Sequence, residues 1–112
     1  MDHKIKEKII EKAIFLEKYG LYDLAWSKKD AQTLINSIIK DKIGILGGDV
    51  YELTPHHLKP LYDNWSCEPY EAESLEEYYL RSKTESLSYI EKYPMHSEEK
   101  IVFSITFTEK IE

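Results

Sequence analysis

The sequence contains few of the residues that link or anchor a chain. Cys67 is the only cysteine among 112 residues, which excludes an intrachain disulfide and a four-thiolate zinc site. No apolar run approaches the roughly 20 residues that a helix needs to cross a bilayer. The first eight residues alternate in charge with no apolar stretch behind them. We therefore expect neither a membrane span nor a signal peptide, and we expect the protein in a reducing cytoplasm.

Motifs that mark catalytic and cofactor sites are also missing. The sequence has no GxGxxG or Walker loop, no GxSxG elbow and no HExxH pair, each of which carries a defined chemistry. Cys67 lies among acidic residues, which disfavour a reactive thiolate. The adjacent His56 and His57 would diverge by about 100° on a helix, so they are poor partners for one metal ion. The sequence predicts no cofactor, no metal site and no catalytic residue. Nucleic-acid binding is disfavoured because the basic residues are scattered.

Apolar residues make up 42% of the chain and aromatic residues 12%, and both kinds are spread along its length. A chain of this size fits one domain and can bury a core of its own. We therefore expect residues 1–112 to form a single domain.

Three helices are predicted from apolar spacing and capping residues. The first covers residues 5–19 and ends at Gly20, and a short linker joins it to the second, which opens with Ser27 as its N-cap. The third opens with Ser74, has a glutamate placed to complete a capping box, and runs to about Lys92, before a proline. These start and stop signals are typical of helices in small globular domains.

Two short strands are predicted around a glycine-rich turn in the middle of the chain. Residues 43–46 and 50–53 are rich in β-formers, and Gly47-Gly48-Asp49 between them has the residue types that tight turns prefer. Thr54-Pro55 is typical of a helix start, which predicts one or two helical turns before Pro60.

The rest of the pattern completes an α+β fold. Residues 64–68 are expected to form a short strand, and residues 101–108 alternate apolar and mostly hydroxyl side chains, as in a half-exposed antiparallel strand. The order is therefore α-α-β-β-(β)-α-β. It predicts an antiparallel sheet of about three to four strands packed against about three helices.

The net charge of −6 is concentrated in one segment, which we call the acidic segment (Pro60–Leu80). This segment contains no Lys or Arg, and outside it acids and bases are equal in number. Aromatic side chains are interleaved with its carboxylates, and Tyr and Trp often carry the binding energy of protein interfaces. The segment therefore predicts a protein partner with a basic surface. The candidate contact residues are Asp63, Trp65, Glu68, Tyr70, Glu71, Glu73, Glu76 and Glu77.

The segment Gly47-Gly48-Asp49-Val50-Tyr51 completes a Gly-Gly-Asp-x-Tyr motif, and Trp26 and Trp65 lie on either side of it. In these features, its size and its order of elements, the chain resembles the Immunity protein 40 family of bacterial polymorphic toxin systems. That family is described by an α+β fold, a characteristic tryptophan and this motif. The resemblance leaves open which tryptophan corresponds. It implies a non-catalytic antidote that binds a cognate toxin and protects the producing cell.

Two other functions fit parts of the sequence. A cytoplasmic adaptor or regulatory module would use the same acidic segment to bind a different protein. A small metal-dependent enzyme would need a pocket that gathers Asp49 with His56 or His57. No motif identifies the toxin, the interface or the oligomeric state.

Overall fold

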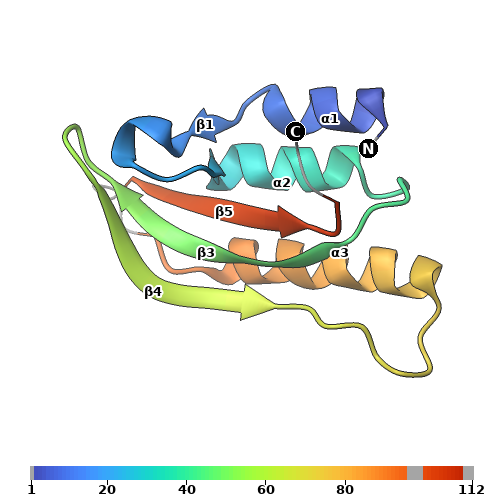
Figure 1. Cartoon of the computed structure of the whole chain (residues 1–112). Helices are drawn as coiled ribbons and strands as arrows, with labels where there is room; N and C mark the ends of the chain where they lie inside the picture. The colour runs from blue at the N-terminus through green and yellow to red at the C-terminus, as the bar shows by residue number, and fades with distance from the viewer. Residues whose placement is uncertain (1, 96–99, 110–112) are drawn as a thin grey trace.

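The structure is a computed structural model that describes residues 2–95 and 100–109. It contains three α-helices and a five-stranded antiparallel sheet with the strand order β1-β2-β5-β3-β4 (Figure 1). The elements follow one another as α1 (His3–Ile10), β1 (Ile14–Phe15), the 3-10 helix η1 (Leu16–Tyr19), β2 (Leu24–Ser27), α2 (Lys28–Ser37), β3 (Ile45–Leu53), β4 (Leu58–Ser66), α3 (Leu75–Lys92) and β5 (Ile101–Phe107). The predicted α+β class is confirmed, with slightly more strands than expected.

The second and third helices begin where capping chemistry places them. The Ser27 hydroxyl accepts a hydrogen bond from the backbone N–H of Asp30 at 3.2 Å. Ser74 and Glu77 form a reciprocal capping box, with each side chain accepting from the backbone N–H of the other residue. These bonds satisfy N–H groups that a helix start would otherwise leave unpaired. None of the helices in the described residues is long and apolar enough to cross a membrane.

The first helix is shorter than its apolar spacing predicts. It ends at Ile10, and Ile14 and Phe15 form a strand that pairs with Ala25 and Leu24 of β2. The expected linker between the first two helices is therefore partly a strand. Gly20 does end a helical segment, in the left-handed conformation at φ 84°, but that segment is the separate η1. Pairing with β2 has overridden a weak helix preference.

The prediction of a turn at Gly47-Gly48-Asp49 is wrong. These residues lie inside β3, a continuous nine-residue strand that pairs with β5 on one side and β4 on the other. The chain reverses after β3 instead, where the backbone N–H of Thr54 donates to the carbonyl of His57 at 2.9 Å. The predicted helical turns before Pro60 are therefore a hairpin turn, and the short strand expected at residues 64–68 is the end of the longer β4.

Strand β5 is central and buried on both faces. Phe103 and Ile105 point to the helices, while Val102 points to the opposite face and is covered by a second small cluster with Leu16 and Ala25. The prediction that this strand is half-exposed is therefore wrong, since η1 folds over the face that the alternating sequence pattern predicted to be open. Within β5 only Thr106 is exposed.

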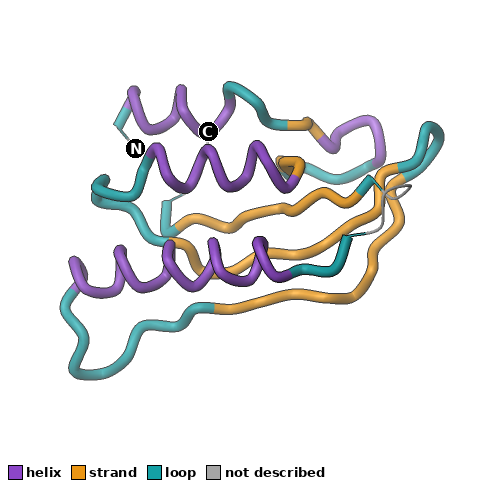
Figure 2. Tube along the Cα trace, turned by 180° about the vertical axis from the view of Figure 1, so that it is seen from behind, coloured by secondary structure: helices purple, strands orange, loops and turns teal. Residues whose placement is uncertain are grey.

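The main core lies between the sheet and the helices, which stand in front of the strands in Figure 2. Trp26, Ile35, Ile90 and Phe103 are among its buried residues. Lys83 of α3 is also fully buried. Its ammonium group donates to the carbonyl oxygens of Ile38 and Asp41 at 2.8 and 2.7 Å, which ties α3 to the end of α2, where helix carbonyls lack partners.

Candidate partner-binding site

The two glycines of the Gly-Gly-Asp-x-Tyr motif allow close packing at the centre of the sheet. A Cβ atom on Gly48 would lie within 3.0 Å of both the Ser104 carbonyl oxygen and the Trp65 ring, and one on Gly47 would meet the Trp65 backbone equally closely. Gly47 also has φ 150°, which side-chain-bearing residues rarely adopt. The two glycines therefore have a structural role. They do not mark a turn; they allow the neighbouring strands and the Trp65 ring to approach the β3 backbone closely.

The other two motif residues point away from the helices. Side chains alternate along a strand, and Val50 faces the helical core, so Asp49 and Tyr51 lie on the opposite side of the sheet. We call this side the helix-free face because it lies away from the three α-helices; the short η1 packs on part of it. Strand register places Ala25, Ser104, Asp49 and Asn64 in one row across β2, β5, β3 and β4.

A cluster of polar groups on the helix-free face shares an uncompensated negative charge. Burial raises the pKa of Asp23, the nearby Asp49 raises it further, and the Ser104 hydroxyl lowers it slightly. Burial and the same two carboxylates also raise the pKa of Tyr51. The Ser104 hydroxyl oxygen is buried next to the Asp23 carboxylate, but among the described residues no partner meets it in good hydrogen-bond geometry. We call Asp23, Asp49, Tyr51 and Ser104 the motif cluster.

The acidic segment covers most of β4, the loop after it and the first turns of α3. Two of its six carboxylates have internal roles. Glu73 holds Arg81 with two hydrogen bonds of 2.6 and 2.8 Å, and its own side chain is only 8% exposed. Glu77 completes the capping box of α3. These two residues shape the segment and are not freely presented.

The remaining carboxylates of the segment face solvent. Asp63 accepts a 2.6 Å hydrogen bond from the Tyr93 hydroxyl. Glu68, Glu71 and Glu76 are exposed, and within the described residues none of them forms an ion pair. These three carry the charge that a partner would encounter first.

The aromatic residues of the segment divide into buried and presented ones. Trp65 stacks on Tyr89 at 4.7 Å between ring centroids and donates to the Ser86 hydroxyl at 2.9 Å. Tyr78 is buried. In contrast, Tyr62 is 87% exposed and Tyr70 is 62% exposed.

Tyr62 is distinctive because its backbone is left-handed, with φ 61°. It lies where the register between β3 and β4 shifts, and such bulges often re-aim a side chain next to a functional site. Tyr70 packs on the Arg81 guanidinium at 3.9 Å. Sequence reasoning did not distinguish these two tyrosines from the buried aromatics.

The tryptophan on the other side of the motif is also a core residue. Trp26 is 1% exposed and its indole N–H donates to the carbonyl of Ile9 at 3.0 Å, at the end of α1. Neither tryptophan is therefore freely presented to a partner.

The residues considered for catalysis lie apart. Asp49 is in the middle of β3, whereas His56 and His57 are exposed beyond the end of that strand. At about 3.3 Å per residue, four residues of strand alone separate them by roughly 13 Å. Among the described residues no three His, Cys, Asp or Glu side chains group in a way that could hold a metal ion. Cys67 is buried, and burial raises the pKa of its thiol.

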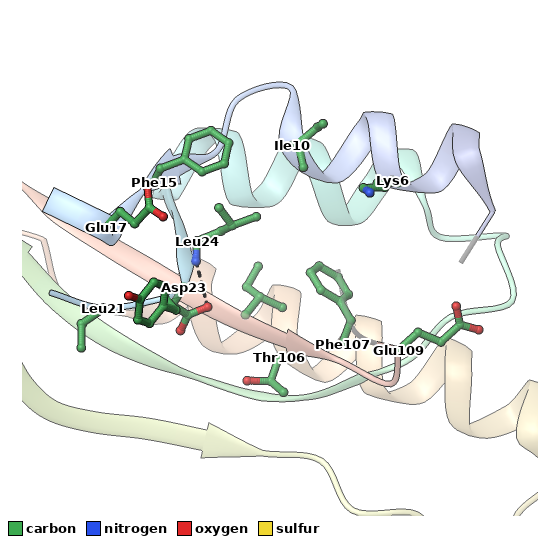
Figure 3. Close-up of a pocket in the computed structure, with 12 residues that line it drawn as sticks. Lys6, Ile10, Phe15, Glu17, Leu21, Asp23, Leu24, Thr106, Phe107 and Glu109 are labelled. Carbon is green, nitrogen blue, oxygen red and sulfur yellow. Dashed lines mark hydrogen bonds between the residues drawn. The ribbon is translucent and has the colours of Figure 1, made fainter. Parts of the chain in front are cut away.

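An apolar groove of about 680 Å³ lies between α1, the segment around η1 and the end of β5 (Figure 3). It exists because β2 pairs with β5 only as far as Ser104, so the end of β5 has no strand beside it there. Ile10, Phe15 and Leu21 expose apolar surface at this groove, and Asp23 lines it as well. The sequence pattern gave no sign of this groove, because it follows from where strand pairing stops.

The carboxylates with internal roles predict an acid-sensitive fold. Hydrogen bonds from Arg81 lower the pKa of Glu73, and bonds to the backbone and side chain of Ser74 lower that of Glu77. Because both folded pKa values lie below the ordinary 4.5, their stabilisation is complete above that pH and is lost as pH falls through the folded values.

We expect the melting temperature, followed by calorimetry, to fall steeply once the pH drops below about 4.5. The raised pKa of Asp23 acts in the opposite direction and offsets part of the fall. The variant Glu73→Gln/Glu77→Gln should be less stable at neutral pH and should lose less on acidification. An equally steep loss in that variant would show that other groups cause the acid sensitivity.

Comparison with known proteins gives one match. A family model described as Immunity protein 40 matches residues 15–107. No curated protein and no solved structure matches the chain. The matched range runs from β1 to the end of β5, so it includes the motif cluster and the whole acidic segment.

Proposed function

This chain belongs to the Immunity protein 40 family, and we propose that it is a cytoplasmic antidote that binds a cognate toxin and blocks it without catalysis of its own. The observation that carries this proposal is the family match over residues 15–107 of 112. An antidote needs a stable fold and a tight binding surface. It needs no active site.

The surface of the acidic segment supports binding to a basic partner. Glu68, Glu71 and Glu76 present negative charge, and the exposed Tyr62 and Tyr70 lie in the same stretch of chain. Clustered charge speeds the encounter with a complementary surface, and tyrosine side chains supply contact area once the two proteins meet. Charge and aromatic anchors are therefore available in one segment.

A toxin that attacks nucleic acid is the partner that this surface suits best. Such a toxin needs a basic groove for the phosphate backbone, and an acidic segment is complementary to it. In this proposal Asp63, Glu68, Tyr70, Glu71 and Glu76 meet the toxin. Trp65, Glu73 and Glu77, also among the candidate contact residues, contribute by holding the segment in shape.

Co-expression with the toxin encoded beside this gene tests the function directly. We expect cells that express both proteins to survive and the two chains to purify as a one-to-one complex. Cell death without a complex would contradict the immunity role and would favour an adaptor that binds another protein.

The role of the acidic surface is tested by association kinetics. We expect Glu68→Gln/Glu71→Gln/Glu76→Gln to slow association with the toxin by about tenfold at low salt, because steering by clustered charge is lost. The difference should shrink as salt is added. Stopped-flow or surface-based kinetics over a salt series measures both effects.

A matched control removes the same number of charges elsewhere. Glu7, Glu11 and Glu91 are exposed, and Glu7 makes only an exposed pair with His3, which is worth little to stability. Changing these three to glutamine should alter the rate much less. Equal slowing in both triple variants would mean that total charge, and not the acidic segment, steers the toxin.

A further inference from the structure

Asp49 of β3 and Asp23, which directly precedes β2, lie on the helix-free face on either side of β5. Ser104 of β5 lies opposite Asp49 of β3 on one side and opposite Ala25 of β2 on the other. Asp23 is two residues before Ala25, so its side chain points to the same face. Its carboxylate accepts the backbone N–H of Leu24 at 2.8 Å, as Figure 3 shows. The charge of Asp49 contributes to the raised pKa of Asp23.

The motif cluster has more acceptors than donors. In residues 2–95 and 100–109 no Lys, Arg or His forms an ion pair with either carboxylate. The Ser104 hydroxyl, on a residue only 1% exposed, has no hydrogen-bond partner in the same residues. Adjacent like charges repel each other, and a buried polar group without a partner is rare in a folded protein. A cationic donor would relieve the repulsion between the carboxylates and could also donate to the Ser104 oxygen.

We propose that Asp23, Asp49, Tyr51 and Ser104 form a receptor site for one guanidinium group, supplied by an arginine of the toxin. The identity of the partner rests on the proposed function. The site lies on the face of the sheet opposite the helices. It gives the Asp and Tyr of the Gly-Gly-Asp-x-Tyr motif a role in recognition, while the glycines of the motif position the strand.

A guanidinium group fits this cluster better than a metal ion or an ammonium group. Its planar donors can reach two carboxylates at once, and its face can stack on an aromatic ring such as that of Tyr51. Asp49 is exposed, so an incoming side chain can reach it from solvent. The Ser104 hydroxyl adds an acceptor beside the carboxylates. Within the part of the chain that the structure describes, no three His, Cys, Asp or Glu side chains group in a way that could hold a metal ion.

The apolar groove continues the site on one side. Asp23 belongs to the motif cluster and also lines the groove (Figure 3). The exposed Phe15 and Leu21 line the groove as well. An arginine held between Asp23 and Asp49 would therefore bring neighbouring side chains of its own chain over apolar surface. Charged recognition and apolar contact would then act in one continuous patch.

A double-mutant cycle on the toxin complex tests the site. We expect Asp23→Asn and Asp49→Asn each to weaken the Kd by about tenfold, measured by calorimetry on the full chain. The double variant should lose less than the product of the two, because both carboxylates hold the same cation. Since these changes remove repulsion, the melting temperature should not fall. Glu11→Gln, which removes one exposed charge on the helical side, should leave the Kd within about twofold.

The outcomes separate this inference from the proposed function. Equal binding of the toxin by the wild-type chain and by Asp49→Asn would overturn the receptor site and leave the immunity role intact. If the wild-type chain does not bind the toxin, the proposed function fails, and the site is then tested by titration with arginine amide, followed by NMR at the amides of Ala25, Asp49 and Ser104. Saturable shifts that Asp49→Asn abolishes support the site. No shift, or a stronger response to lysine amide, overturns it.

Discussion

Replacing Gly48 by alanine is expected to destabilise the protein by about 3 kcal/mol, the upper end of the usual range for an overpacked core. The added methyl group would lie within 3.0 Å of the Ser104 carbonyl of β5 and of the Trp65 ring of β4. One of these neighbours is backbone of the central strand, so it cannot move without breaking the register between β3 and β5. Urea denaturation of the purified variant measures the loss.

Gly20→Ala is the matched control for this prediction. Gly20 has φ 84°, and nothing lies within 4 Å of the position that an added methyl group would occupy. Its substitution therefore tests backbone strain alone and should cost about 1–2 kcal/mol. Combining Gly48→Ala with Trp65→Leu should cost less than the sum of the two single changes, because the ring clash disappears while the clash with Ser104 stays. A Gly48→Ala variant as stable as Gly20→Ala would show that the sheet can relax around the added atom.

Replacing Trp26 by alanine is expected to cost about 3–5 kcal/mol, as large-to-small changes of buried aromatics do. Trp26 is 1% exposed, packs edge-on against Phe107 at 6.2 Å between ring centroids, and holds the end of α1 through the Ile9 carbonyl. Its loss therefore opens the core and releases α1 together. Small domains are stable by only about 5–15 kcal/mol, so a large fraction of the total should disappear in denaturant titrations.

Phenylalanine substitutions separate the hydrogen bond from the packing. Trp26→Phe leaves the Ile9 carbonyl without its donor and should cost more than Trp65→Phe. The Ser86 hydroxyl that Trp65 binds also donates to the Ser82 carbonyl at 2.7 Å, so it keeps a partner. The difference should be about 1 kcal/mol. A larger cost at Trp65 would contradict this ranking and would mark Trp65 as the more important of the two tryptophans for the fold.

Local chemistry allowed much of the secondary structure to be predicted. The helix that opens at Ser74 and the one that opens at Ser27 begin where expected, because an N-cap and its partner lie within three residues of each other. The position of the final strand was also predicted, since its β-forming residues continue over seven positions. Interactions between residues a few positions apart can be predicted from a sequence, because both partners are close together in it.

Only part of the candidate site could be predicted from the sequence. The acidic segment was found from charge alone, and Glu77 was expected to complete the capping box of the third helix. Glu73 was not distinguished from Glu68, Glu71 and Glu76, because its pairing with Arg81 depends on the folded loop. The same holds for the aromatics. The sequence does not tell a buried Tyr78 from an exposed Tyr62, because the helix packing and the bulge in β4 decide which ring reaches solvent.

By itself the sequence determined the α+β class, the capped helices and a segment of concentrated negative charge, since each depends on residues close together in the chain. Only the tertiary structure decided that Gly47-Gly48-Asp49 lies inside a central strand. A glycine suits a turn and a crowded strand equally well, and the crowding comes from Trp65 and Ser104, which lie far along the chain. Only the tertiary structure placed Asp23 and Asp49 on one face, on either side of β5, because strand pairing joins segments that nothing in the local sequence connects.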